Sequence, residues 1–139
     1  MRVHEIMHHV VSVPGYSSVA GVAQRMDVEC ADSVLVRHAG AVGICTERDI
    51  LRKIVARGRD PAHVSVADVM SCPLHTISWD DSVEDASERM NELHVRRLVV
   101  MQNGEIIGVI SAECIARNVK YITARRLTSL GSLSEGLAL

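Results

Sequence analysis

An internal repeat restricts the fold of this chain more than any other feature of its sequence. Ser18-Val19 and Arg25-Met26 return as Ser82-Val83 and Arg89-Met90, which lie 64 positions further along (82 minus 18). Matches at offsets of 63 and 65 positions extend the repeat in both directions: Ile6-Met7 with Val69-Met70, Gly43-Ile44 with Gly108-Val109, and Ile50 with Ile115. Because the matches keep their order along the chain, we expect two copies of one supersecondary unit.

In each copy the sequence pattern predicts a helix, a two-stranded hairpin and a closing helix. The apolar residues of the first helix recur at intervals of three and four, which places them on one face: Val19, Val22, Ala23 and Met26 in one copy, Val83, Ala86 and Met90 in the other. Hairpins are predicted over 33–45 and 97–110, and Asn103-Gly104 is a strong turn signal in the second. Since neither copy has enough sheet to bury a core alone, we expect an α/β fold of two pseudo-symmetric motifs packed through small sheets.

The boundaries of the copies follow from their turn residues. Gly58-Arg59-Asp60-Pro61 has the Gly and Pro that commonly follow a helix, which predicts a break between copies at about residue 60. We therefore divide the chain into motif 1 over 1–60, motif 2 over 61–119 and a C-terminal tail over 120–139. The tail is rich in Ser, Gly and Leu, and it is interpreted either as a loose extension or as a weak docking segment.

Composition and charge exclude several classes of partner. The net charge is −2 and only three residues are aromatic, so the chain lacks the basic surface and stacking platform of a nucleic-acid binder. No apolar run is long enough to cross a membrane, and the first residues carry charges where a secretory signal would be apolar. The four cysteines form no Cys-x-x-Cys pair, which favours buried thiols in a reducing cytoplasm.

The sequence offers little support for a metal site or a catalytic centre. Its seven histidines are spread along the chain with no Cys-x-x-Cys pair beside them, and no nucleophile elbow, P-loop or paired carboxylates are present. An enzyme that uses Cys45 or Cys114 is an alternative hypothesis, but no sequence motif supports it. We therefore expect no enzymatic activity and no bound metal.

Thr46 to Asp49 is the best candidate for a binding site. A hydroxyl and free backbone N–H groups at a helix N-terminus bind phosphate well, and a carboxylate one turn later can accept hydrogen bonds from both hydroxyls of a ribose. The alternative is a capping box, in which the same spacing only closes the helix end. Ser65–Asp68 and Ser82–Asp85 have this spacing too, and we interpret both as plain caps.

Three segments in this order resemble the cystathionine-β-synthase (CBS) domain family, whose motifs occur in pairs called Bateman modules. Gly43 to Ile50 is similar to the family's Gly-aliphatic-aliphatic-Thr-x-Arg-Asp-aliphatic signature, and His94 to Val100 is similar to its Arg-containing strand. Ile6-Met7 and Asp68 to Met70 match the start of each motif. The resemblance covers about residues 1–119 and implies a β-α-β-β-α topology for each copy.

The resemblance also implies a ligand, an oligomeric state and a set of contacts. Family members bind adenosine compounds (AMP, ADP, ATP, S-adenosylmethionine or NAD) in two clefts between the motifs, and many form homodimers through their helices. The carboxylate of one copy faces a wall from the other copy, so the implied nucleotide-binding residues are Thr46, Arg48, Asp49, Met70, Pro73, His75, His94, Val95, Arg96 and Arg97. Of the two adjacent arginines, one is expected to reach a phosphate, or else both lie on the surface and balance nearby acidic residues.

The second cleft is expected to be weaker. The repeat alignment places Ser111 opposite Thr46 and Cys114 opposite Asp49. A serine can still cap a helix, but a thiol accepts hydrogen bonds too weakly to replace a carboxylate.

The sequence therefore predicts a cytoplasmic regulatory module that binds an adenosine nucleotide, with AMP as the preferred candidate. It would form a homodimer and act on an effector protein encoded elsewhere. The alternative is a ligand-free module for dimerisation or protein interaction.

Overall fold

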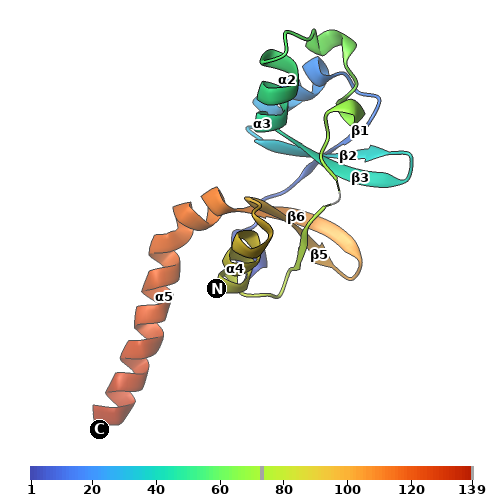
Figure 1. The fold of residues 1–139 in the computed structure, drawn as a ribbon. Helices are drawn as coiled ribbons and strands as arrows, with labels where there is room; N and C mark the ends of the chain where they lie inside the picture. Colours follow the sequence, from blue (N-terminus) through green and yellow to red (C-terminus); the bar gives the residue numbers. More distant parts are fainter. Residues whose placement is uncertain (73, 139) are drawn as a thin grey trace. The chain divides into compact units, whose positions relative to one another are not determined.

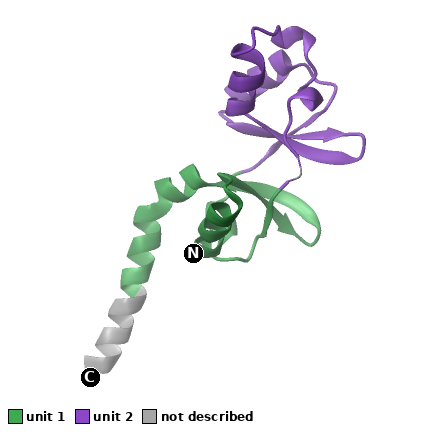
Figure 2. Cartoon of the chain, in the orientation of Figure 1, with its two compact units in different colours: residues 1–8, 75–139 green, residues 9–74 purple. Residues whose placement is uncertain are grey.

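The chain forms two compact units, which we describe one at a time from a computed structural model (Figure 2). Residues 1–72 and 74–138 are described, with side chains described up to residue 128. Unit 2 comprises residues 9–74, and unit 1 comprises residues 1–8 together with 75–139. Each unit has its own three-stranded sheet, so the α/β class and the repeated motif predicted from the sequence are confirmed.

Unit 2 contains the first copy of the repeat. Its sheet has the order β1-β2-β3, with β1 parallel to β2 and β2 antiparallel to β3 (Figure 1). Its elements are β1 (Val11–Pro14), α2 (Val19–Val28), β2 (Ser33–His38), β3 (Ala41–Thr46), α3 (Glu47–Ile50), the π-helix η1 (Leu51–Val55) and the 3-10 helices η2 (Pro61–His63) and η3 (Val66–Asp68).

Unit 1 contains the second copy and repeats this topology. Its sheet has the order β4-β5-β6, again with one parallel and one antiparallel pair. Its elements are α1 (Val3–Ile6), β4 (Thr76–Ser78), α4 (Val83–Leu93), β5 (Arg97–Gln102), β6 (Glu105–Ser111) and α5 (Ala112–Ala138).

Local sequence accounts for the ends of these elements. The Ser18 hydroxyl accepts a hydrogen bond from Gly21 N at 3.1 Å, and the Ser82 hydroxyl accepts one from Asp85 N at 3.0 Å, so both long helices are capped alike. Ser65 makes no such side-chain bond, so its interpretation as a cap is wrong. The two-residue turns that follow β2 and β5 have positive φ at both positions, as type I′ turns require: Ala39 (49°), Gly40 (78°), Asn103 (51°) and Gly104 (78°).

The compact units cross the boundaries of the sequence repeat. Residues 1–8 precede the first copy, yet Val3 and Ile6 are buried in unit 1, in the core formed by the second copy. Residues 61–74 pack in unit 2 with the first copy. We call these two stretches the leading segments, because each precedes one copy and completes the core of the other.

The leading segments make matched hydrogen bonds. Val3 N donates to Asp81 O at 2.9 Å in unit 1, and Val66 N donates to Ser17 O at 2.8 Å in unit 2. Each segment also adds a single bridge to the free edge of a sheet, His8 to Val109 in unit 1 and Ser71 to Ile44 in unit 2. The pseudo-symmetry therefore extends to backbone pairings that lie far apart in the sequence.

The predicted division at residue 120 has no counterpart in the backbone, because α5 continues from Ala112 to Ala138 (Figure 1). Ile122 packs against the unit 1 core, and Arg125 Nη1 lies 3.0 Å from Glu5 Oε1. The first part of the predicted tail is thus held against its own unit. None of the helices in the described part of the chain combines the length and hydrophobicity needed to cross a membrane.

Candidate functional site

The predicted Thr46–Asp49 site lies where β3 ends and α3 begins. Asp49 N donates to Thr46 Oγ1 at 3.3 Å, and Thr46 N donates back to Asp49 Oδ2 at 3.0 Å. The Thr46 hydroxyl also lies 3.2 Å from Asp49 Oδ2. The capping box that we considered as an alternative is therefore formed.

The second carboxylate oxygen of Asp49 has a different set of partners. Ser71 Oγ donates to Asp49 Oδ1 at 3.3 Å, and Lys53 Nζ lies 3.1 Å from the same oxygen. Lys53 also donates to the Val69 carbonyl oxygen at 2.8 Å, so its ammonium joins α3–η1 to the leading segment. The Asp49 side chain is only 14% exposed, whereas that of Lys53 is 37% exposed. One shielded carboxylate thus accepts bonds from two hydroxyls, an ammonium and a backbone amide. We call these four residues the Asp49 cluster: Thr46, Asp49, Lys53 and Ser71.

Sequence reasoning missed Lys53 and Ser71. The spacing of Asp49 and Lys53 is the i, i+4 interval of a helical ion pair, and this was an available signal. Ser71 gave no local signal, since it lies 22 positions from Asp49.

Gly43 explains how Ser71 reaches this place. The Ser71 bridge to Ile44 has N···O distances of 2.8 and 3.0 Å, so the leading segment runs directly against β3. A Cβ at residue 43 would lie 2.7 Å from Met70 Sδ and 3.0 Å from Ser71 O, which is too close for either contact. The absence of a side chain at Gly43 therefore lets the leading segment approach and places Ser71 beside Asp49.

The second copy has the same backbone arrangement with different chemistry. Ser111 is buried, and its hydroxyl accepts a hydrogen bond from Cys114 N at 3.0 Å. The Cys114 thiol donates to the Ile6 carbonyl oxygen at 2.7 Å. Cys114 occupies the position of Asp49 in the repeat, but its side chain is a thiol that bonds to the main chain. The second copy therefore has no carboxylate at this position.

The remaining predicted residues belong to two groups. Arg48 is exposed on α3 and Met70 is half-buried, both in unit 2, whereas Pro73 lies outside the described residues. The rest of the implied wall belongs to unit 1: His75, His94, Val95, Arg96 and Arg97.

Two of these unit 1 residues differ from expectation. Arg96 is exposed and precedes β5, which begins at Arg97, so the two arginines are not consecutive on a strand. His94 is the C-cap residue of α4 and adopts the left-handed conformation, with φ of 55°, so it does not belong to the strand that the resemblance implied.

The cysteines require one correction. Cys45 is buried and Cys114 is half-buried, but Cys30 and Cys72 are exposed, so buried thiols describe only part of the set. Burial raises the pKa of the Cys45 thiol to about 12, and the nearby Asp49 charge adds to the rise. At neutral pH this thiol is protonated and a poor nucleophile. Within the described ranges, no three His, Cys, Asp or Glu side chains gather closely enough to hold a metal ion.

Comparison with known proteins identifies the class. The sequence model of the CBS domain matches residues 3–56 and 66–121, one match for each copy of the repeat. The chain therefore belongs to the CBS domain family and contains a tandem pair of these domains.

Three curated relatives illustrate the similarity. An uncharacterised protein of Methanocaldococcus jannaschii is 34% identical over 78% of this chain and 60% of its own length. The CBS domain-containing protein YhcV of Bacillus subtilis is 30% identical over 73% of this chain and 79% of its own. An uncharacterised protein of Methanopyrus kandleri is 37% identical, and this chain covers only 43% of it. The chain thus spans about half the length of the first curated relatives that it matches.

Solved structures agree with the fold. The hexameric CBS-CP12 protein from bloom-forming cyanobacteria is 27% identical, with a TM-score of 0.80 over 88% of this chain and 74% of that one. A CBS domain protein of Pyrobaculum aerophilum in complex with AMP is 26% identical, with a TM-score of 0.71 over 83% of this chain and 90% of that one. CBS domain pairs are regulatory modules.

Proposed function

We propose that this CBS pair is a sensor that binds an adenosine nucleotide, with AMP as the preferred ligand, at the Asp49 cluster. The observation that carries the proposal is a shielded carboxylate beside a lysine and two hydroxyls at the start of α3. A ribose offers two adjacent hydroxyl donors, and an ionised carboxylate has about four acceptor positions. Thr46 N and Oγ1, Ser71 Oγ and Lys53 Nζ fill these positions in the structure. A ribose would therefore bind Oδ1 in place of Ser71 and Lys53, while Oδ2 keeps its bonds to Thr46.

The charges around the cluster suit a phosphate. Arg48 is exposed on α3, and Lys53 Nζ is 3.1 Å from the carboxylate, so two cations would be available to a phosphate bound near Asp49. The Thr46 hydroxyl and the α3 N-terminus add donors. The Pyrobaculum aerophilum relative was solved in complex with AMP, which supports AMP as the ligand of choice.

The predicted unit 1 residues would complete the site: His75, His94, Val95, Arg96 and Arg97. The cluster around Cys114 would form the weaker second site, because it has no carboxylate for the ribose. Binding would alter the shape of the module or its affinity for an effector protein, in line with the regulatory role of the family. Nothing in this mechanism requires catalysis.

The alternative function is a ligand-free structural module, and the completed capping box favours it. In that case Asp49 only closes the N-terminus of α3 and pairs with Lys53. Thermal unfolding of the full chain with and without AMP separates the two proposals. A ligand that binds only the folded state raises the free energy of unfolding by about 2.7 kcal/mol when its concentration is about a hundred times its Kd. If the melting temperature is unchanged at millimolar AMP, ADP, ATP, S-adenosylmethionine and NAD, the sensor proposal is wrong and the structural module is the remaining function.

We also propose that the chain forms a homodimer through its helices. Ile50, Leu51, Ile54 and Val55 make the sequence of α3 and η1 broadly apolar, as a helix that packs on a partner would be. Ile54 is in fact buried in its own unit, while Leu51 is 58% and Val55 is 65% exposed. These two exposed side chains lie one helical turn apart and are the residues available to a partner. The hexameric cyanobacterial relative supports self-association.

A further inference from the structure

The surface of unit 1 has an open hollow that lies outside the Asp49 cluster. Its volume is about 460 Å³, and residues of β4, α4 and the β5–β6 turn line it. The residues that matter for its chemistry are Trp79, Asp81, Arg89 and Asn103. The volume falls in the range of small-molecule pockets, roughly 300–1,000 Å³.

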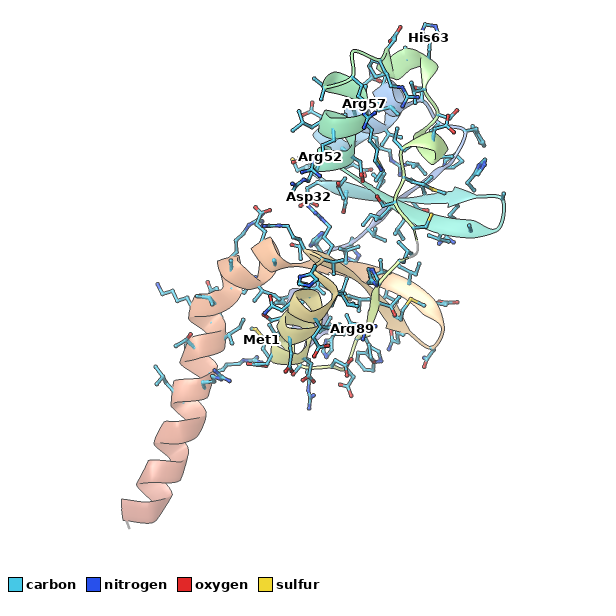
Figure 3. All side chains as sticks on the ribbon, in the orientation of Figure 1. Met1, Asp32, Arg52, Arg57, His63 and Arg89 are labelled. Carbon is cyan, nitrogen blue, oxygen red and sulfur yellow. The ribbon has the colours of Figure 1, made fainter. Side chains whose placement is uncertain are left out.

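Arg89 is fixed in place but has no acidic partner. It projects from α4 (Figure 3), and its Nε donates to the Thr76 carbonyl oxygen at 2.8 Å. The corresponding residue of unit 2 is Arg25, whose Nη1 donates to the Ser12 carbonyl oxygen at 3.4 Å and whose Nε lies 3.6 Å from Glu29. In unit 1 the position of Glu29 is occupied by Leu93, and across the described residues Arg89 makes no ion pair.

Asp81 supplies a carboxylate to the same hollow. Its Oδ2 accepts a hydrogen bond from Ser78 N at 3.2 Å, which orients the side chain at the start of the β4–α4 turn. In the part of the chain that the structure describes, no cation pairs with it, Arg89 included. The corresponding residue of unit 2 is the uncharged Ser17. A cation and an anion thus line one hollow without neutralising each other.

The corresponding surface of unit 2 is covered by side chains. Gly15 occupies the position of Trp79, and a Cβ added to it would lie 2.6 Å from the His38 side chain, so the imidazole rests on this glycine. Arg37 crosses the same surface, and its Nε donates to Ser12 Oγ at 3.2 Å. In unit 1 the Trp79 ring is instead packed against His4, with ring centroids 5.0 Å apart. The hollow therefore results from residues particular to the second copy and is not a property of the repeated fold.

We propose that this hollow binds a small zwitterion of the α-amino acid class. The ligand carboxylate would accept from the Nη groups of Arg89, a geometry in which charge-assisted pairs are strong. Its ammonium would donate to Asp81, and the Asn103 amide would lie beside the polar head. This ligand site is separate from the two nucleotide sites proposed around Asp49 and Cys114.

The single tryptophan of the chain makes the proposal directly measurable. Trp79 is the only indole in the sequence and lines the hollow, so its fluorescence reports occupancy there. The full chain is titrated with each standard α-amino acid that is not itself fluorescent. We expect a saturable change in Trp79 emission with at least one of them. The N-acetyl derivative of that amino acid, which has lost the ammonium, and its amide, which has lost the carboxylate, should both bind at least about tenfold more weakly.

Variants test the two charges separately. Arg89→Gln and Asp81→Asn should each raise the Kd by about tenfold or more, since each removes a charge-assisted pair. Arg25→Gln is the matched control, because it removes the corresponding helix-to-strand contact in unit 2 and should leave the Kd unchanged. Circular dichroism verifies that each variant is folded. If Arg89→Gln does not fold, Asp81→Asn still tests the proposal, because its amide oxygen can accept the hydrogen bond from Ser78 N.

Three results would overturn the proposal. The first is the absence of a saturable change with any amino acid at millimolar concentration. The second is equal binding of the N-acetyl derivative, which would describe a simple anion site. The third is an AMP-induced emission change that depends on Arg89, which would make the hollow part of a nucleotide site.

Discussion

The two units have the same topology and the same long-range backbone pairings, yet they differ where polar side chains meet the surface. Asp49 is replaced by Cys114, Glu29 by Leu93, and Gly15 by Trp79. None of these replacements alters the sheet order or the bridge made by the leading segment. The fold depends on the glycines, caps and aliphatic cores that the copies share, so the exposed polar positions are free to acquire separate functions.

The closing helices differ in another way. Ile54 in η1 is 1% exposed, whereas Val119, its counterpart in α5, is 55% exposed. In unit 2 the helix widens into a π-turn and ends near Gly58, which has a positive φ of 64°. In unit 1 the helix continues without a break to Ala138. The same sequence position is therefore core in one copy and surface in the other.

The largest effect should come from this pair of positions. Ile54→Ala removes a fully buried side chain and should lower the free energy of unfolding by about 2–5 kcal/mol. Val119→Ala changes an exposed residue and should alter it by about 0.5 kcal/mol or less. Urea denaturation followed by circular dichroism measures both. Equal losses in the two variants would show that Val119 is covered in solution.

The second effect concerns the two predicted ligand sites. Asp49→Ala should weaken AMP binding by roughly 1.5–3 kcal/mol, because bonds to a charged acceptor are lost, while stability falls by about 1 kcal/mol or less. Cys114→Ala should leave AMP affinity nearly unchanged, and the wild-type chain should bind one AMP tightly. Isothermal titration calorimetry gives affinity and stoichiometry together. If Asp49→Ala lowers the melting temperature but leaves the affinity for AMP unchanged, Asp49 serves only as a helix cap. Two equal AMP sites per chain would contradict the predicted difference between the two copies.

The smallest effect concerns self-association. Leu51→Asp places a charge on the exposed face of η1 and should weaken the dimer by about tenfold, close to 1.4 kcal/mol. Val28→Asp is the matched control, since Val28 is 82% exposed on the same unit but lies on α2. Sedimentation velocity at micromolar concentration distinguishes the species. A wild-type monomer, with or without AMP, would eliminate the homodimer proposal.

Much of the fold was readable from the sequence because its signals are local. The period of Val19, Val22 and Met26, the caps at Ser18 and Ser82, and the Asn103-Gly104 turn each act within a few residues, and each is present in the structure. The repeat then supplied the order of the elements.

The features that sequence reasoning missed depend on contacts between distant residues. Ser71 approaches Asp49 only because the leading segment bridges Ile44, and no local pattern encodes that pairing. The exposure of Cys30, which follows the end of α2 with φ of 53°, is likewise set by the turn it occupies rather than by its apolar neighbours. The alignment of the copies did identify Cys114 opposite Asp49, but not the thiol's bond to Ile6.

The crossing of the leading segments also imposes an order on biosynthesis. Unit 2 is continuous from residue 9 to residue 74, so all of its parts have been made before the second copy emerges from the ribosome. Unit 1 must wait, because residues 1–8 are translated before unit 2 and their partners in the second copy are translated after it. Since chains grow at about 5–20 residues per second and early domains fold first, Val3 and Ile6 remain exposed to solvent and to chaperones until β6 is complete. When residue 74 has just left the exit tunnel, unit 2 can thus be complete while residues 1–8 still lack the sheet against which they pack.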